Sequence, residues 1–358
     1  MIFDFMNTHR IPVSSGMIYT LRTRLLMVTA GMNLRCMTRL LLSLSIAVPI
    51  LIHPAHAGYE KREPVQQFID MMVEKHDYSR LQLAIWFQQV VKQEETLKSL
   101  DKPAESMPWH RYRKIFMTEK RINDGVQFWK DNRETLKRAN ELYGVPAEII
   151  TAILGVETFY GKYKGKYPVF DTLVTIAFDY PKRAEFFKKE LEQYLLLIKE
   201  EALDARDLKG SYAGAMGKPQ FISSSYRHYA VDFDGDGKRD LLNNTADAIG
   251  SIANYFSEHG WKKDSPIAVT ASYKSDQAFP EFDMKPQQTI SELSKLGIFP
   301  SQPVRASLIA TPIRLEQPDH GEYWLGLENF YVITRYNHSN LYAMAVYQLS
   351  QSIKNSMQ

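Results

Sequence analysis

Apolar side chains recur at every third or fourth position through most of the chain, the spacing that places them on one face of a helix. The pattern runs through Phe68, Met71 and Met72, and it returns through Leu83 and Trp86. It predicts that residues 62–142 are mainly helical, with a proline-containing break at 102–108 before a helix over 123–143. Further helices are predicted over 147–159, 172–203 and 340–353.

Two stretches depart from this pattern. Residues 207–245 are rich in Gly, Ser and Asp, which is typical of loops around short helices. Residues 263–328 contain seven of the 17 prolines together with short β-prone runs. We therefore expect a mainly α protein of the α+β class. Its expected parts are a leader (1–57), a helical domain (58–142), a core (143–262), a small β-containing domain (263–328) and a C-terminal segment that returns to the core (329–358).

The first 57 residues have the layout of a secretory signal peptide. Arg35 and Arg39 precede an apolar run over 40–52, which is followed by the A-x-A sequence ending at Ala57. The run is too short to cross a hydrocarbon core of about 30 Å as a helix. We expect export to the periplasm and cleavage after Ala57, the alternatives being a buried helix or a membrane anchor. Cys36 precedes the apolar run, so a lipid anchor at this residue is not expected.

The charge of the chain depends on this leader. The formal net charge is +3, but residues 1–57 carry five arginines and a single acid, which leaves 39 bases and 40 acids in residues 58–358. Such a balanced chain gives no electrostatic reason to expect a nucleic-acid partner. Because Cys36 is the only cysteine, disulfides and cysteine metal sites are excluded from the mature protein.

Glu157 is the first candidate for chemistry. Ile150, Ile153 and Leu154 lie seven, four and three residues before it, so they share its helical face. Loss of hydration on an apolar face favours the neutral acid, and a carboxyl group in that state can donate a proton near neutral pH. The alternative, on this local pattern alone, is a helix-end glutamate that is satisfied by a neighbouring donor.

Several ordered motifs resemble those of the membrane-bound lytic murein transglycosylase B family. The segment around Glu157 reads ILGVETFYG, and matching segments follow it over nearly all of the mature chain. They are FDYPKRA (178–184), GSYAGAMG (210–217), QF (220–221), SSY (224–226), ANYF (253–256) and TRYNHS (334–339). Two departures are visible. The family commonly has a proline before the SSY segment, whereas this chain has Ile222 and Ser223 there. Lys218 with Pro219 is also unusual between the glycine and the glutamine.

The resemblance implies a lysozyme-like core at 143–262, flanked by an α domain and a small β-containing domain, with the glycan in a groove. It implies cleavage of the β-1,4 bond between N-acetylmuramic acid and N-acetylglucosamine without water, which leaves a 1,6-anhydromuramyl end. Glu157 matches the single acid and base of that reaction. By position in the motifs, the candidate substrate-binding residues are Ser211, Gln220, Tyr112, Tyr255, Tyr336, Asn337 and Tyr342; for each single tyrosine, core packing is the alternative.

An ordinary glycosidase generally needs a pair of carboxyl groups. No second candidate is evident in the motifs, and Asp171 and Glu185 are interpreted as structural. The reaction that the resemblance implies uses no catalytic cofactor. The expected partners are peptidoglycan glycan strands, with proteins of cell-wall synthesis or remodelling as further candidates, and we expect a monomer. The rival hypotheses are a hydrolytic muramidase and a glycan-binding relative without turnover.

An acidic loop at 232–243 fits an EF-hand calcium loop. Carboxylates at loop positions 1, 3, 5 and 9, glycine at position 6 and a carbonyl at position 7 match the pattern, but position 12 has an amide instead of a bidentate carboxylate. The predicted ligands of a structural calcium ion are Asp232, Asp234, Asp236, Lys238, Asp240 and Asn243. The alternative is a hydrogen-bonded acidic turn without a metal.

Overall fold

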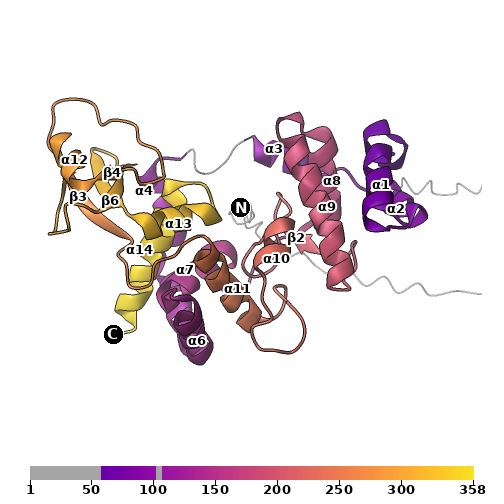
Figure 1. Cartoon of the computed structure of the whole chain (residues 1–358), viewed down its shortest axis with the longest axis horizontal. Coiled ribbons are helices and arrows are strands. Elements are labelled where there is room, and N and C mark those ends of the chain that lie inside the picture. Colours follow the sequence, from indigo (N-terminus) through magenta and orange to yellow (C-terminus); the bar gives the residue numbers. More distant parts are fainter. Residues whose placement is uncertain (1–57, 102–106) are drawn as a thin grey trace, which may run out of the picture. The chain divides into compact units, whose positions relative to one another are not determined.

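The computed structural model describes residues 58–101 and 107–358 (Figure 1). The predicted leader, with Cys36 and the cleavage site after Ala57, lies outside the described residues. The described chain is mainly helical with a small sheet, which confirms the predicted α+β class. Its α-helices are α1 (Glu63–His76), α2 (Arg80–Gln88), α3 (Glu94–Leu100), α4 (Trp109–Phe116), α5 (Glu119–Asp131), α6 (Arg133–Tyr143), α7 (Ala147–Thr158), α8 (Val169–Asp179), α9 (Ala184–Glu200), α10 (Ser223–Tyr229), α11 (Thr245–Glu258), α12 (Ile290–Lys295), α13 (Glu328–Tyr336) and α14 (Asn340–Ser356).

Two of the predicted helices are interrupted. The helix predicted over 123–143 breaks at Asn132, whose side-chain amide donates to the Phe128 carbonyl at 2.8 Å and so caps α5 before α6 begins. The helix predicted over 172–203 breaks after Tyr180 because Pro181 lacks an N–H group and restricts the residue before it. A polar residue in one case and a proline in the other therefore end helices that the apolar spacing alone predicted to be continuous.

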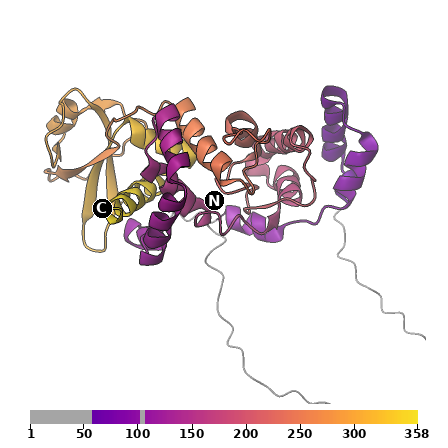
Figure 2. The same cartoon turned by 90° about the horizontal axis from the view of Figure 1, so that it is seen from below.

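A five-stranded antiparallel sheet forms from the proline-rich stretch, with the order β4-β6-β7-β3-β5. Its strands are β3 (Ala268–Tyr273), β4 (Gln288–Thr289), β5 (Ile298–Pro300), β6 (Ile309–Glu316) and β7 (Gly321–Gly326). Two short strands, β1 (Tyr167–Pro168) and β2 (Lys209–Gly210), pair separately. In Figure 2 the strands of the larger sheet lie beside the C-terminal helices, and the rings of Trp324 and Tyr347 meet there at 5.9 Å.

The hydrophobic side chains of the described residues form two clusters. The larger cluster runs from Tyr59 to Ile353 and includes buried side chains of α1, α2, α4 and α6 to α9, with α5 packed against it, so residues 58–142 share a core with the residues that follow them. The smaller cluster lies between Val269 and Leu327, within the sheet and α12. Ile313 on β6 belongs to the larger cluster. One face of the sheet therefore packs in the larger cluster and the other face packs in the smaller cluster. The exact domain boundaries stay a prediction.

Candidate active site

Glu157 lies in the last turn of α7, where every residue from Glu148 to Thr158 is buried. The residue is only 4% exposed. α14 packs against α7 and brings Tyr342 to the carboxylate, and Tyr342 Oη donates a hydrogen bond to Glu157 Oε1 at 2.6 Å. The helix has therefore placed one carboxyl group in an apolar setting, as the spacing around Glu157 predicted. The hydroxyl donor is the feature that the alternative interpretation named, and the role of Glu157 stays a prediction.

Three of the predicted tyrosines form a row that leads away from Glu157. The rings of Tyr342 and Tyr336 stack at 6.5 Å, and those of Tyr336 and Tyr255 meet edge to face at 5.0 Å. Burial, followed by the nearby charge of Glu157, raises the pKa of both Tyr336 and Tyr342 well above the ordinary value. The hydroxyls of Tyr336 and Tyr342 therefore remain neutral donors. Tyr336 donates to the Pro219 carbonyl at 2.6 Å, and Tyr255, the third tyrosine of the row, donates to the Arg335 carbonyl at 2.5 Å.

Ser211 and Gln220 belong to one compact turn. Met216 pairs with both Gly210 and Phe221, which brings the two ends of the segment together. Gln220 adopts a left-handed backbone with φ of 53°, and its Nε2 donates to the carbonyls of Gly217 at 3.0 Å and Lys164 at 3.2 Å. Ser211 Oγ accepts from the Ala213 and Ala215 amides at 3.2 and 3.1 Å. Both side chains are thus fixed by the turn, and Gln220 lines a cavity that also contains Tyr336.

The remaining two predicted residues are placed differently. Tyr112 is fully buried between the rings of Trp109 and Phe116, so packing accounts for much of its environment. It still lies close enough to Tyr342 to contribute to the raised pKa of that residue. Asn337 is partly buried at the end of α13, directly after Tyr336 and before α14.

Sequence reasoning missed the backbone that follows Glu157. Phe159, Tyr160 and Gly161 are all left-handed, with φ values of 52°, 62° and 84°, an arrangement that non-glycine residues adopt only at a cost of order 1–3 kcal/mol each. Tyr160 compensates by donating from its hydroxyl to the Arg121 carbonyl at 2.7 Å. A Cβ atom added at Gly155 would lie 2.6 Å from that hydroxyl oxygen. A glycine inside a helix, five residues before Tyr160, was the available signal.

Lys218, noted only as unusual in the sequence, connects the site to the acidic loop. Its carbonyl accepts from Thr158 Oγ1 at 2.8 Å, immediately beside Glu157 in the chain. Its Nζ donates to the Asn243 carbonyl at 2.6 Å and to Thr245 Oγ1 at 2.5 Å. Burial, and then the charge of Lys164, lower the pKa of Lys218. Lys218 therefore connects the turn that contains Gln220 to the end of α7 and to the acidic loop with the start of α11.

The acidic loop brings together three carboxylates, one of which the sequence analysis did not include. Ligand oxygens of Asp232, Asp234 and Asp247 all lie within 4.8 Å of one another. Asp247 is fully buried in the first turn of α11 and accepts from the Phe233 amide at 2.7 Å. Of the other predicted ligands, Asn243 Oδ1 accepts from Lys164 Nζ at 3.3 Å.

The rest of the predicted loop ligands contact their own loop. The Oδ1 atoms of Asp236 and Asp240 accept from backbone amides two or three residues later, and Lys238 is exposed. The three clustered carboxylates fit a hard divalent cation such as calcium, which prefers oxygen ligands. Burial raises the pKa of Asp247, and the charges of Asp234 and Asp232 raise it further, which is the repulsion that a cation would relieve.

Comparison with known proteins identifies the family. The sequence profile described as "Transglycosylase SLT domain" matches residues 60–351. The chain belongs to this family of lytic transglycosylases. The membrane-bound lytic murein transglycosylase B of Escherichia coli (strain K12) is 43% identical over 319 residues, which cover 85% of this chain and 88% of that protein.

Two solved structures of similar SLT-family proteins support the assignment. The catenated lytic transglycosylase SltB1 of Pseudomonas aeruginosa matches with a TM-score of 0.79 and 44% identity, covering 84% of this chain and 100% of that chain. The Escherichia coli lytic transglycosylase Slt35, solved with calcium, matches with a TM-score of 0.78 and 43% identity over 86% of this chain and 99% of that chain. The lysozyme-like core that the motifs implied is therefore confirmed, and this SLT-family chain is a peptidoglycan-degrading lyase.

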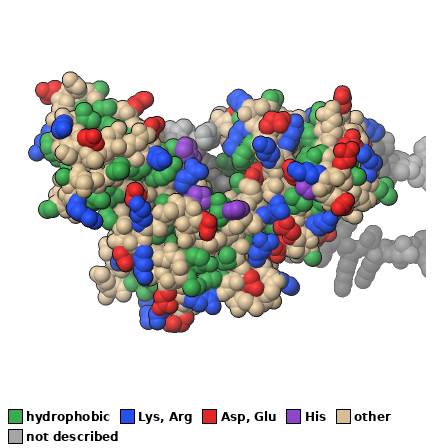
Figure 3. All heavy atoms as spheres, viewed as in Figure 1, with side chains coloured by type: hydrophobic (Ala, Val, Ile, Leu, Met, Phe, Trp, Pro, Cys, Tyr) green, Lys and Arg blue, Asp and Glu red, His purple; other side chains and the backbone are tan. Residues whose placement is uncertain are grey.

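The surface of this SLT-family protein is consistent with its balanced charge. On the face shown in Figure 3, basic and acidic side chains are interspersed over the described residues. Within the same described residues, no helix has both the length and the apolar character needed to span a membrane.

Proposed function

We propose that the enzyme cleaves the β-1,4 bond between N-acetylmuramic acid and N-acetylglucosamine with Glu157 as its single acid and base. The observation that carries the proposal is the buried Glu157 carboxyl group with Tyr342 Oη at 2.6 Å. In its neutral form Glu157 donates a proton to the glycosidic oxygen as the bond to C1 breaks. The same carboxylate then takes the proton of the muramyl C6 hydroxyl, whose oxygen bonds to C1 and closes the 1,6-anhydro ring.

The other buried carboxylates of the described residues all have structural partners. Asp171 pairs with Arg206, and Glu148 pairs with Lys354 Nζ at 2.8 Å. Glu190 accepts from the Ser224 hydroxyl at 2.7 Å, and Asp247 accepts from the Phe233 amide at 2.7 Å. Glu185, which the sequence analysis also considered, is exposed and contacts Lys188. This supports a mechanism without a second catalytic carboxylate, in which the substrate's own N-acetyl group stabilises the cationic intermediate.

The substrate-contacting groups follow from the same geometry. Tyr336, Tyr255, Gln220 and Ser211 offer neutral hydroxyl and amide groups along the turn and the tyrosine row, which suit sugar hydroxyl and acetamido groups. A related transglycosylase, SltB3 of Pseudomonas aeruginosa, is 28% identical with a TM-score of 0.69 and was solved with NAG-NAM-pentapeptide. That complex supports a peptidoglycan strand as the ligand of this chain too.

Product analysis tests the proposed reaction against a hydrolytic muramidase. Purified sacculi are digested with the enzyme, and the released fragments are weighed by mass spectrometry. We expect fragments that end in 1,6-anhydromuramic acid, which lack the mass of one water. Fragments that end in a reducing sugar would instead identify a muramidase, and no release of fragments at all would identify a binding protein.

Calcium is proposed as a structural ion at Asp232, Asp234 and Asp247. For a Kd of about 10⁻⁴–10⁻³ M, calcium at about 10 mM should add roughly 1.4–2.7 kcal/mol to the free energy of unfolding. Thermal melts with EDTA and with calcium measure this as a rise of a few degrees in Tm. Asp234→Asn should remove most of the rise.

The control for calcium is Asp276→Asn, an exposed carboxylate outside the loop, and it should keep the rise. Equal melting of the wild type with and without calcium would contradict the proposed ion. The rate of folded enzyme should change little, since no loop group is suited to glycan chemistry.

Export through the predicted signal peptide is also proposed. The Escherichia coli relative is described as membrane-bound, whereas this chain is expected to be released into the periplasm beginning at Gly58. Amino-terminal sequencing of the protein from cells checks this, and an uncleaved or lipid-modified terminus would contradict it.

A further inference from the structure

Two lysines contact both the proposed active site and the end of the acidic loop. Lys218 Nζ donates to the Asn243 carbonyl at 2.6 Å. Lys164 Nζ donates to Asn243 Oδ1 at 3.3 Å and to the carbonyl of the preceding residue at 2.7 Å. On the other side, the Lys218 carbonyl accepts from Thr158 Oγ1 at 2.8 Å, and the Lys164 carbonyl accepts from Gln220 Nε2 at 3.2 Å. These two residues, called the lysine pair below, therefore bond the loop through their ammonium groups and active-site side chains through their carbonyls.

The path from the loop to Glu157 is short. The Lys218 amide donates to the Leu241 carbonyl at 2.9 Å, and a Cβ atom added at Gly217 would collide with that same carbonyl, so the turn and the loop end are in close contact. Thr158, which accepts no exposure to solvent and follows Glu157 in the chain, bonds the Lys218 carbonyl directly. A movement of the loop end would therefore reach the neighbour of Glu157 through one residue.

The lysine pair bonds the loop at the position where an EF-hand loop bonds its metal. In such a loop the twelfth residue closes the site with a bidentate carboxylate. Asn243 has that position here, and its Oδ1 accepts from Lys164 Nζ. The clustered carboxylates lie elsewhere, because Asp232 and Asp234 are near the start of the loop and Asp247 is on α11. Ammonium groups therefore bond the loop end in place of a metal ligand.

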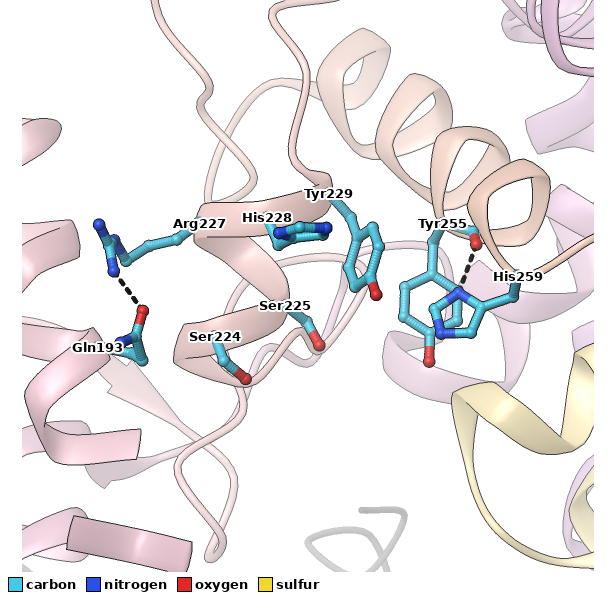
Figure 4. A pocket seen from close by; sticks show the side chains of 8 residues that line it. All are labelled: Gln193, Ser224, Ser225, Arg227, His228, Tyr229, Tyr255 and His259. Carbon is cyan, nitrogen blue, oxygen red and sulfur yellow. Dashed lines mark hydrogen bonds between the residues drawn. The ribbon is translucent and has the colours of Figure 1, made fainter. Parts of the chain in front are cut away.

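The partners of the lysine pair are uncharged. Arg227, a cation of α10, pairs with the Glu200 carboxylate and also donates to the side-chain oxygen of Gln193 (Figure 4). The hydrogen bonds of the two lysine ammonium groups to the described residues all go to carbonyl, amide or hydroxyl oxygens. Burial, and then the charge of Lys164, lower the pKa of Lys218. The two ammonium groups therefore lie together at an electrostatic cost, which their bonds to the loop end offset.

We propose that the lysine pair positions the active site: it holds the end of the acidic loop against the turn that contains Gln220, so that the geometry around Glu157 does not depend on calcium. The inference rests on the proposed function, because it concerns the groups that the proposed cleavage uses. A displacement of about 1 Å in such groups can lower a rate by about 10²-fold. Calcium at the clustered carboxylates would then add stability without being required for the rate.

The test measures kcat on purified sacculi in EDTA and in about 10 mM calcium. The wild type should have the same kcat in both. Lys218→Met keeps most of the apolar stem and removes the ammonium group, so in EDTA its kcat should fall by roughly 3- to 30-fold. Calcium should restore it to within about threefold of the wild type, because the ion then orders the loop instead. Lys164→Met should change in the same direction.

Lys209→Met is the matched control for the loss of one positive charge. Lys209 is exposed on β2, two residues before Ser211, and its ammonium group forms no hydrogen bond or ion pair with the described residues. This variant should keep the wild-type kcat with and without calcium.

Hydrogen exchange gives a second readout that needs no substrate. In EDTA the amides of residues 241–245 should exchange about tenfold faster in Lys218→Met than in the wild type, since the loop end has lost its bond to the turn. In calcium the two proteins should exchange at similar rates.

The outcomes separate the alternatives. An unchanged kcat of both lysine variants in EDTA would overturn the proposal, and so would a wild-type rate that itself requires calcium. An equal loss in EDTA and in calcium would overturn it too, because the lysines would then only support the fold. If Lys218→Met does not fold, Lys164→Met still decides. Failure of the proposed cleavage would show instead in the mass of the products, which does not depend on calcium.

Discussion

Glu157→Gln should reduce cleavage of peptidoglycan by about 10²- to 10⁴-fold while leaving the fold and glycan binding intact. The amide has nearly the same shape as the carboxyl group and can still contact Tyr342, but it can neither give a proton to the glycosidic oxygen nor take one from the C6 hydroxyl. The rate of fragment release from purified sacculi measures the loss, and a thermal melt with a sedimentation assay on sacculi checks fold and binding.

Glu148→Gln provides the matched control for this result. Glu148 is also a buried acid of α7, but it lies at the other end of the helix and pairs with Lys354. This variant should keep near-wild-type turnover, with at most a modest loss of stability from the broken ion pair. Turnover of Glu157→Gln within about tenfold of the wild type would remove Glu157 from its role.

Tyr342→Phe should lower kcat by roughly 10- to 100-fold, the effect of losing a hydrogen bond to a charged group worth about 1.5–3 kcal/mol. The hydroxyl donates to Glu157 Oε1, a position from which it can stabilise the carboxylate that forms when the proton moves to the glycosidic oxygen. Rate measurements on sacculi test this effect.

Tyr347→Phe is the control on the same helix. Its hydroxyl donates to the Ala268 carbonyl at 3.3 Å, on the side of α14 that meets the sheet. Loss of that bond should change Tm slightly and leave kcat near the wild-type value. If Tyr342→Phe keeps the wild-type kcat as well, Tyr342 does not assist Glu157.

The helices and the position of Glu157 could be predicted from the sequence because both depend on local spacing. Apolar residues at three- and four-residue intervals define α7, and they also place Glu157 on its apolar face. The motifs added Tyr336, Tyr342 and Gln220, which the structure links to Glu157 or to one another through contacts and a shared cavity. Their roles toward the substrate stay proposals.

The features of the site that could not be predicted depend on contacts between residues that are far apart in the chain. Asp247 joins the acidic loop only because α11 folds back on it, and the loop pattern ends at position 243. Lys218 acquires its contacts from Thr158 and Thr245, 60 and 27 residues away. The left-handed turn after Glu157 is stabilised by the Arg121 carbonyl on α5. Periodicity cannot reveal such pairs, because it reports only on neighbours along one helix.

The hydrogen bond from α14 to α7 also makes the arrangement around Glu157 depend on α14, which comes last in chain order. Glu157 is translated well before Tyr342, and α14 supplies much of the surface that covers α7. A nascent chain that ends before residue 340 therefore contains the acid but neither its donor nor its packing partner. We expect such a chain to be inactive on sacculi, and a truncation after Ser339 would check this. The site would then be complete only when the C-terminal helix has packed against α7.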